Sequence, residues 1–598
     1  MLQAGQMPET DRALLQSVAR IVIAASDGLR AGRSHRSTTT SAATKLANAR
    51  PAETAAVVVM PAAPMASKDG LLFDNGLGGF SADGREYVIT VSADRMTPLP
   101  WVNVLANSSF GTLVSESGSA STWSENAQQF RLTPWSNDPV SDPSTEAFYI
   151  RDEDTGHVWS PTLQPTASTD AGAGPHVARH GFGYSVFEHT AEGIDSELTM
   201  FVAIDAPIKF VVLQLRNATS RTRRLSVTGY VEWVLGDERR KTAMHVGTEV
   251  DATGGALFAR NVYNTDFEGR TAFFDGDDGG SDTPARSVCG DRCAFIGRDG
   301  SLREPVAMSQ PRLSGTVGFA LDPCAAIRLP LDLAAGQTGV LVFRLGAGTN
   351  EGEARQLVQR WRGLTAAQEA LAAVKQYWTD ALGAVQVQTP DRSLDILANG
   401  WLVYQTLSCR LWARTAFYQA SGAFGFRDQL QDVMALVHAT PALVREHLLR
   451  SASRQFPEGD VQHWWHPDSG RGVRTRCSDD YLWLPLATAR YVQVTGDAGV
   501  LDELVHFVGG PALKDDEVSS YDRPLTSHVA QPLYEHCRLA IEHGLRFGAH
   551  GLPLMGSCDW NDGMNLVGVE GKGESVWLGF FLGFVLTQFG ELARRRND

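Results

Sequence analysis

The stretch LSVTGYVEWV at residues 225–234 decides how the first half of the chain folds. It is rich in β-branched and aromatic residues, which are typical of β-strands. Comparable runs lie at 87–91, 209–215 and 340–345, and turn signals built from Gly, Asn and Asp separate such runs at short intervals. The region from about Leu71 to Ala347 is therefore predicted to form a large antiparallel β-sandwich.

The composition changes after this region. Residues 351–381 have apolar side chains at helical spacing and predict a helical linker. Beyond Ser393 the chain alternates longer apolar helices with long loops rich in Trp, Arg, Asp and His. Helix pairs with polar loops on one side indicate a toroid of helical hairpins, with its site at the loop ends. The residues after Ser393 suffice for about half of a closed ring, so we expect an incomplete one.

Four segments are thus expected along the chain: a leader at 1–68, a β-sandwich of carbohydrate-binding type at 69–348, a helical linker at 349–390, and the partial helical toroid at 391–598. The leader is rich in Ala, Ser and Thr and has little periodicity. This composition predicts disorder, or a remnant of a preceding module.

Charge and cysteine usage narrow the class of protein. The 53 basic and 68 acidic residues give a net charge of −15, which disfavours nucleic acid as a partner. No apolar run approaches the ~18 residues of a membrane span, and 576–586 predicts a buried helix. Seven scattered Cys suit reduced thiols and hence a cytoplasmic protein. No metal is expected, because Cys289 and Cys293 lack a second ligand pair, and His463 and His466 lack a third ligand.

Two segments of the helical region carry polar and aromatic side chains beyond the needs of a surface helix. The sequence FRDQLQD at 426–432 opens a helix, where Asp428 is explained as well by the helix dipole as by a site. The segment 454–480 contains Trp464 and Trp465, which would wall a polar pocket. These residues indicate a sugar or another flat, polar ligand.

Two further segments lie in loops. In GSCDWNDGMN at 556–565, Asp559 and Asp562 could serve as acid and base, or one of them could serve alone. The alternative is a turn built from Asp and Asn side-chain hydrogen bonds. The loop is expected to lie against the core, since it follows an apolar stretch and precedes a buried helix. In the β region, the segment 123–138 offers Arg131 between Trp residues, which would suit sugar contacts or form a packed loop.

Taken together, these stretches closely resemble glycoside hydrolase family 94. The resemblance runs from about Leu71 to the end of the chain, and the nearest branch is the phosphorylase-like C-terminal region of cyclic β-1,2-glucan synthases. The matching stretches are NGLGGFSADGREYVI (75–89), WSNDPVSDPSTEAFYIRDEDTG (135–156), YQASGAFGFRDQLQDVMAL (418–436), FPEGDVQHWWHPDSGRGVRTR (456–476), SDDYLWLP (478–485) and GSCDWNDGMN (556–565).

The resemblance implies an N-terminal β-sandwich, a helical linker, an (α/α)6 barrel and a small C-terminal β-domain. It also implies inverting phosphorolysis of β-glucosides, with release of α-glucose 1-phosphate. Inorganic phosphate is then a co-substrate and no cofactor is required. Phosphate is already an anionic nucleophile, so a single acid is enough, whereas an inverting hydrolase needs a second carboxylate.

The resemblance also implies roles for individual residues. It makes Asp562 the general acid, with Trp560 beside it in the sugar site. Asp562 must then be held protonated, by burial or by a nearby charge such as that of Asp559. The loop with Arg131 would cover the site, in this family often from the partner subunit of a homodimer. The residues implied to contact or shape the sugar pocket are Arg427, Asp428, Asp432, Asp479 and Asp480.

The sequence departs from the family pattern at three points. Cys558 stands where Gly is expected, and Leu566 stands where a basic residue is expected. The second half of the barrel, which carries most of the family's phosphate-binding residues, is missing from the expected architecture. Two alternatives therefore stand beside a β-1,2-glucan phosphorylase: a truncated, non-catalytic β-glucan-binding protein or synthase fragment, and a remnant completed by a second polypeptide.

Overall fold

The computed structural model describes residues 70–92, 94–166, 174–279, 286–564 and 566–598. The predicted leader at 1–68 lies outside these ranges.

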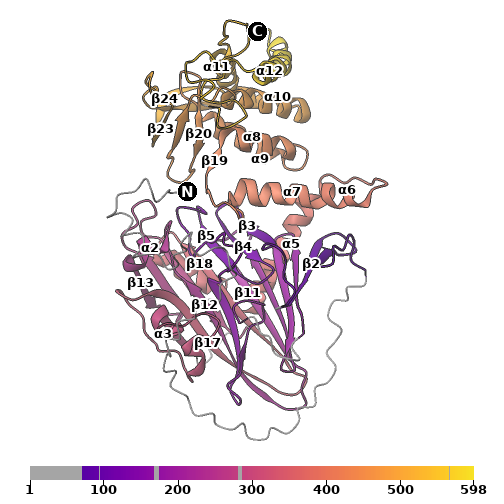
Figure 1. Cartoon of the computed structure of the whole chain (residues 1–598), viewed down its shortest axis with the longest axis vertical. Coiled ribbons are helices and arrows are strands. Elements are labelled where there is room, and N and C mark those ends of the chain that lie inside the picture. The colour runs from indigo at the N-terminus through magenta and orange to yellow at the C-terminus, as the bar shows by residue number, and fades with distance from the viewer. Residues whose placement is uncertain (1–69, 93, 167–173, 280–285, 565) are drawn as a thin grey trace, which may run out of the picture. The chain divides into compact units, whose positions relative to one another are not determined.

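A ten-stranded antiparallel sheet dominates the first half of the described chain (Figure 1). In spatial order its strands are β1 (Gly78–Phe80), β2 (Glu86–Val91), β8 (His176–Gly181), β9 (Tyr184–Ala191), β10 (Ile194–Val202), β11 (Ile208–Asn217), β18 (Thr338–Gly348), β15 (Thr271–Asp277), β14 (Leu257–Asn261) and β13 (Val246–Val250).

Two smaller antiparallel sheets accompany the large one. The five-stranded sheet comprises β16 (Ser287–Asp291), β17 (Pro323–Leu333), β12 (Arg223–Glu232), β6 (Glu146–Asp152) and β7 (Val158–Trp159). The three-stranded sheet comprises β3 (Val102–Ala106), β4 (Phe110–Ser115) and β5 (Ala120–Ser124). The stretch quoted at the outset forms the central strand β12, and its Val227 packs with Leu213, Ile327 and Phe343 in the core between the sheets. The expected antiparallel β architecture is therefore present.

A buried ion pair connects all three sheets. Lys209 of β11 donates to Glu146 of β6 at 2.7 Å and to Thr112 of β4 at 3.1 Å. Glu146 also accepts hydrogen bonds from Thr122 of β5 at 2.6 Å and from Thr133 at 2.8 Å. Both charged side chains are almost completely buried, so each depends on the other for its charge to be tolerated.

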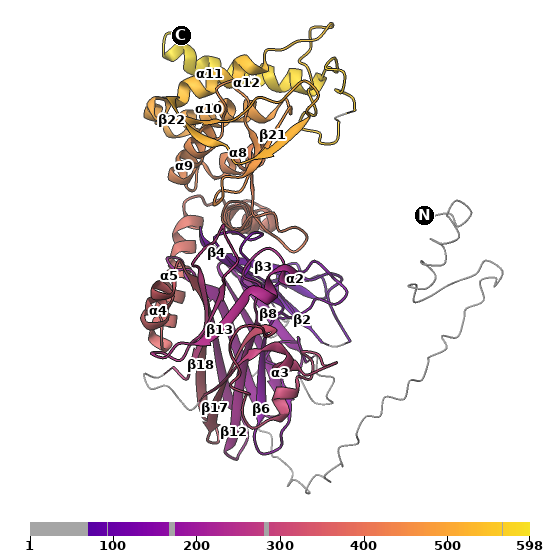
Figure 2. The ribbon, with the colours of Figure 1, turned by 90° about the vertical axis from the view of Figure 1, so that its left-hand side faces the viewer.

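Two helices follow the sandwich and pack against β18 (Figure 2). They are α4 (Glu351–Arg360) and α5 (Leu364–Gly383), and they bury the apolar stripe that predicted a linker helix. A helical run from 392 to 413 comes next, made of α6 (Arg392–Ile396), the π-turn η4 (Leu397–Trp401), α7 (Leu402–Gln405) and the π-turn η5 (Thr406–Ala413). Tyr404 in this run donates to Asn103 of β3 at 2.9 Å.

The last part of the described chain is mainly helical. Its helices are α8 (Phe426–Leu436), α9 (Pro441–Ala452), α10 (Trp483–Thr495), α11 (Leu533–Gly544) and α12 (Val576–Arg595). Short strands that the sequence did not predict lie between them: β19 (Phe424–Gly425), β20 (Gln462–Trp465), β21 (Gly472–Thr475) and β23 (Ser519–Asp522) form one sheet, and β22 (Leu504–Gly509) and β24 (Leu525–Pro532) form another. The expected long loops are thus partly hairpins.

The short helical elements of the described chain are α2 (Arg239–Thr242), η2 (Ala243–His245), α3 (Arg292–Ile296), η3 (Val306–Ser309), η6 (Asp480–Leu482) and η7 (Ala498–Asp502).

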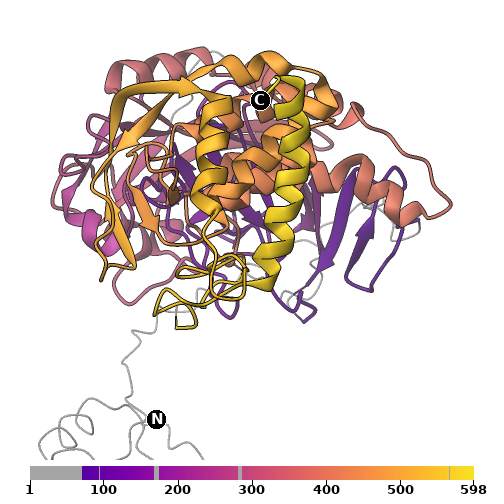
Figure 3. The ribbon, with the colours of Figure 1, turned by 90° about the horizontal axis from the view of Figure 1, so that it is seen from above.

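Helix α12 lies beside α10, as the yellow helix in Figure 3 shows. Leu578, Leu582 and Val585 on one face are buried, whereas Phe580 and Phe584 on the other are 79% and 53% exposed. The prediction of a buried helix is therefore correct for one face only. By length and composition alone, α12 is long and apolar enough to cross a membrane, and 28% of its most apolar window is buried. The core helix of a soluble protein can pass the same test.

We expect Lys209→Met to lower the free energy of unfolding by about 3–5 kcal/mol, because it leaves the Glu146 carboxylate buried without a partner. The double variant Lys209→Met, Glu146→Gln should recover part of this loss, since it removes both charges. Urea unfolding of the three proteins at neutral pH measures both effects. Equal stability of the single variant and the unmodified chain would contradict a structural role for the pair.

Candidate active site

One guanidinium group gathers three of the segments singled out in the sequence. Arg427, in the first turn of α8, is buried beside the fully buried Phe426. Its Nη1 donates to both carboxylate oxygens of Asp479 at 3.3 Å and to the carbonyl oxygen of Asp559 at 3.1 Å. Its Nη2 donates to Asp562 Oδ1 at 2.7 Å. Arg427 therefore ties α8 to the turn before η6 and to the DWND loop, defined here as residues 556–563.

Asp479 and Asp480 lie at the buried start of η6. Asp479 also accepts a hydrogen bond from Trp483 Nε1 at 3.0 Å. Burial and the neighbouring charge of Asp480 raise the pKa of Asp479 to about 7, against the opposing effect of Arg427. One carboxyl of this pair is therefore able to hold a proton near neutral pH.

Asp480 binds His463 of β20, with Oδ2 2.7 Å from His463 Nδ1. Burial lowers the pKa of His463, but the hydrogen bond and the charge of Asp480 outweigh it, so the pKa is raised above its usual value. Among the described residues, no donor reaches the other oxygen of Asp480, Oδ1, which is also buried. An unpaired buried acceptor of this kind is costly unless another group satisfies it.

Within the DWND loop, Asp559 serves as an anchor. Its Oδ1 accepts hydrogen bonds from the backbone and side chain of Asn561 at 2.8 and 3.0 Å. Its Oδ2 accepts from Ser575 Oγ at 2.6 Å, and Ser575 Oγ in turn accepts from Leu578 N at 2.9 Å at the start of α12. The turn-building alternative thus describes Asp559, which is itself almost fully buried.

Asp562 has a different environment. Its side chain is 69% exposed, so Asp562 itself does not lie against the core. The loop lies against the core only up to Asp559, and residues 560–564 are exposed. Trp560, 48% exposed, stands 6.2 Å from Trp577 between ring centroids. An exposed carboxylate and an exposed indole side by side suit a polar ligand such as a sugar.

A pocket of about 520 Å³ lies at the N-terminal end of α8. Asp428 and Trp464 line it, together with Arg410 and with Gln128 from the sandwich. Its wall is mixed polar and apolar, and its size is in the range of small-molecule sites. Its full lining is Gln128, Arg410, Gln419, Ala420, Ser421, Ala423, Gly425, Asp428, Gln429, Trp464 and His466.

Three further predicted residues lie elsewhere. Trp465 is fully buried and packs against Phe424 and Phe426, so it has no face to offer a sugar. Asp432 does not line the pocket, but it accepts a hydrogen bond at 2.9 Å from Nε of Arg410, which does.

Arg131 is the third. It donates to the carbonyl oxygens of Ala127 and Asp237 at 3.1 and 2.9 Å and stacks over Trp135. These contacts keep Arg131 within the sandwich. From the same segment, Gln128 rather than Arg131 lines the pocket.

Contrary to the prediction from the sequence, the cysteines are not all reduced thiols. Cys477 and Cys558, 81 residues apart, form a disulfide, so the prediction of reduced thiols throughout was wrong. Cys289, Cys293, Cys324, Cys409 and Cys537 are free thiols. Cysteine usage therefore no longer supports the predicted cytoplasmic location. The departure of Cys558 from the expected Gly was the one signal available in the sequence.

A metal would have to compete with this bond. His463, Cys477 and Asp480 offer ligand atoms within 4.8 Å of one another. Metal ligation requires the thiolate of cysteine, and Cys477 is bonded to Cys558 instead. In the disulfide form this cluster therefore lacks its sulfur ligand.

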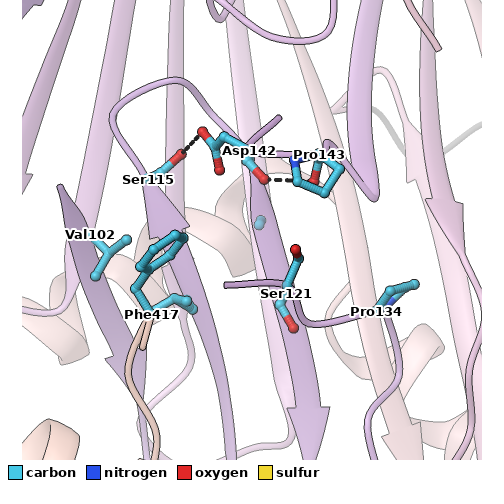
Figure 4. Close-up of a pocket in the computed structure, with 11 residues that line it drawn as sticks. Val102, Ser115, Ser121, Pro134, Asp142, Pro143 and Phe417 are labelled. Atoms are coloured by element: carbon cyan, nitrogen blue, oxygen red, sulfur yellow. Dashed lines mark hydrogen bonds between the residues drawn. The ribbon is translucent and has the colours of Figure 1, made fainter. Parts of the chain in front are cut away.

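A second, much smaller pocket lies in the sandwich between Val102, Pro134 and Phe417 (Figure 4). Its volume is about 20 Å³, room for about one water molecule. Ser115 donates to Asp142 at 3.2 Å beside it. It is too small to hold a sugar.

The fold and these motifs define a carbohydrate-active enzyme class. Residues 85–364 match the family described as "Glycosyl hydrolase 94, supersandwich domain", and residues 377–598 match "Glycosyl hydrolase 94 superfamily, catalytic domain". The chain belongs to glycoside hydrolase family 94, with an N-terminal supersandwich domain followed by a helical catalytic domain.

Among its relatives is the cyclic beta-(1,2)-glucan synthase NdvB of Rhizobium meliloti (strain 1021), 43% identical over 88% of this chain and 18% of the synthase. Another is the N,N'-diacetylchitobiose phosphorylase of Vibrio furnissii, 28% identical over 87% of this chain and 65% of that enzyme. The chain thus spans less than two thirds of the length of these relatives. A bacterial glucoamylase complexed with acarbose superposes with a TM-score of 0.41 at 8% identity, covering 68% of this chain and 59% of that one, a likeness too weak to carry an argument.

The pKa of Asp479 predicts a pH-dependent stability. The pKa of Asp479 is raised from 3.8 to about 7 in the folded chain. At a pH between these two pKa values, folding is therefore accompanied by uptake of a proton. The stability that this group contributes is lost as the pH rises through about 7. Asp479→Asn should remove this dependence, so that the unmodified chain loses stability relative to the variant as the pH rises.

Urea midpoints measured at half-unit steps between the two pKa values test this expectation. Asp480→Asn is the matched variant, because it removes the neighbouring charge and should shift the loss to lower pH. Parallel profiles for the unmodified chain and Asp479→Asn would rule out proton uptake at this residue.

Proposed function

We propose that the chain acts as an inverting glycoside phosphorylase, with Asp562 as the general acid. The observation that carries the proposal is the convergence on Arg427 of Asp479, the Asp559 carbonyl and Asp562. A glycosidic bond can lie in such a site with charged groups on several sides, as charge development at the sugar requires. Membership of family 94, whose relatives include phosphorylases, supports the same reaction class.

The reaction balances with one carboxylic acid. Asp562 gives its proton to the glycosidic oxygen as the bond to the anomeric carbon breaks. An oxygen of inorganic phosphate attacks that carbon from the opposite face, which forms α-glucose 1-phosphate. The proton carried by the phosphate returns, through solvent, to the Asp562 carboxylate. No cofactor enters these steps.

The ion pair between Arg427 and Asp562 determines when Asp562 is free to act as the general acid. Arg427 Nη2 donates to Asp562 Oδ1 at 2.7 Å, so the guanidinium holds this carboxylate oxygen. Asp562 must therefore separate from Arg427 before it can reach a glycosidic oxygen. A sugar hydroxyl that takes the place of Asp562 on Arg427 would bring about this separation, and the exposed position of the loop residues 560–564 leaves room for it.

The neighbouring pocket supplies the proposed sugar contacts. Asp428 lines it with an exposed carboxylate, and Trp464 offers a ring face. Asp432 would act through Arg410, to which it is bonded. A β-1,2-linked gluco-oligosaccharide is the proposed substrate, because the relative named as a β-(1,2)-glucan synthase is 43% identical. A homodimer belongs to the same proposal.

The helices α8–α12 are proposed to form part of an (α/α)6 barrel. The exposed apolar face of α12, with Phe580 and Phe584, supports this, since the inner or lateral face of a toroid helix is covered by the next helix.

The proposal is tested by release of glucose 1-phosphate from β-1,2-gluco-oligosaccharides in phosphate buffer. Asp562→Asn should lower kcat by at least about 100-fold, since general acid catalysis typically contributes that much or more. Glu570→Gln is the control, because this exposed carboxylate contacts only Lys572 among the described ion pairs. Its rate should equal that of the unmodified chain.

Two results would overturn the proposal. An unchanged rate in Asp562→Asn would exclude this residue as the acid. Binding of the oligosaccharide by calorimetry without any turnover would favour the alternative function, a non-catalytic β-glucan-binding protein.

A further inference from the structure

The disulfide joins the two loops that meet at Arg427. Cys477 lies two residues before Asp479, and Cys558 lies directly before Asp559 and four residues before Asp562. Arg427 also contacts both loops, through Asp479 and Asp562. The covalent bond and the charged cluster thus hold the same two segments together.

The backbones of the loops approach closely around this bond. Ser478 donates to the carbonyl oxygen of Cys558 through its backbone N at 2.9 Å and its Oγ at 3.0 Å. Ser557 N donates to the carbonyl oxygen of Arg476 at 3.1 Å. Gly556 has φ +67°, and a Cβ there would stand 2.0 Å from that same carbonyl oxygen, so glycine is required. The two cysteine Cα atoms are consequently 4.7 Å apart, within the range a disulfide spans.

The DWND loop has few other attachments on the way to Asp562. Asp559 is fixed through Ser575 and Asn561, but residues 560–564 are exposed. The contact that Asp562 makes with Arg427 must break before Asp562 can reach the glycosidic oxygen. At that moment, the link from Cys558 to Cys477 and the anchor at Asp559 determine where the loop sits.

We propose that Cys477 and Cys558 are positioning residues whose disulfide state controls the proposed reaction: the oxidised pair holds Asp562 over the sugar, and the reduced pair releases the loop. This inference rests on the proposed function. Oxidation converts two thiols to one disulfide with the loss of two protons and two electrons, which a low-molecular-weight disulfide such as glutathione disulfide accepts by thiol exchange. A dithiol reductant reverses the step.

The test compares the unmodified chain after equilibration with glutathione disulfide and with dithiothreitol, both with a chelator so that no metal occupies the free Cys477 thiolate. Alkylation and peptide mass spectrometry report the state of both cysteines. Reduction should lower kcat about tenfold with little change in KM, because misplacement of a reacting group by about 1 Å reduces the rate steeply. Re-oxidation should restore it.

Two variants separate the effect from general redox sensitivity. The double variant Cys477→Ser, Cys558→Ser should have the kcat of the reduced chain in both buffers. Cys289→Ser removes a free thiol of the sandwich and should keep the full response. If the double variant fails to fold, reduction of the unmodified chain still gives the answer.

Hydrogen exchange of residues 556–564 gives a readout that does not depend on turnover. Faster exchange on reduction, confined to this loop, supports the positioning role of the disulfide even when no phosphorolysis is detected. In that case the proposed function fails, but the inference about the disulfide does not. Free thiols at Cys477 and Cys558 in the glutathione disulfide buffer would overturn the inference. Equal kcat and equal exchange in the two redox states would do so as well.

Discussion

A buried positive charge organises the candidate site. Arg427 is almost inaccessible to solvent, and a guanidinium in that position has to be surrounded by acceptors. Asp479 from the turn before η6, and the Asp559 carbonyl and Asp562 from the DWND loop, supply them. The need to satisfy this one group therefore determines which loops meet. The sandwich is held by a similar constraint, because Lys209 and Glu146 are buried together where its three sheets join.

Much of this arrangement could be predicted from residue patterns. Runs of β-branched and aromatic residues between turn signals predicted the strands of the sandwich. Helical spacing predicted α8 to α12, because burial of one face of a helix imposes this period directly. The small sheets around β20 and β22 escaped detection. Their strands are short and partly exposed, so hydrogen bonding between distant segments, rather than local hydrophobic pattern, decides their formation.

Some of the site residues could likewise be predicted from the sequence, and others could not. The motifs brought Arg427, Asp479 and Asp562 to notice, and these do lie together. Whether an Asp holds a turn or stays exposed depends on its neighbours in space, which distinguishes the buried Asp559 from the exposed Asp562 although only two residues lie between them. Trp465 and Arg131 were candidates by residue type alone, and packing places one in the core and the other against the sandwich backbone. The spacing of the cysteines in the sequence does not predict the pairing of Cys477 with Cys558, because this pairing follows from two loops that meet at Gly556.

A hydrogen bond between Asp559 and Ser575 joins the two ends of the loop that precedes α12. Both ends of the intervening segment are pinned, one at the anchor carboxylate and the other at the helix cap, while Val569, Glu570, Gly571 and Lys572 are exposed. Closing a longer loop between fixed ends is inexpensive, about 0.6 kcal/mol for each doubling of length. The exposed residues 569–572 can therefore accept inserted residues, or a grafted recognition peptide, while the anchors at Asp559 and Ser575 keep both ends of the segment in place.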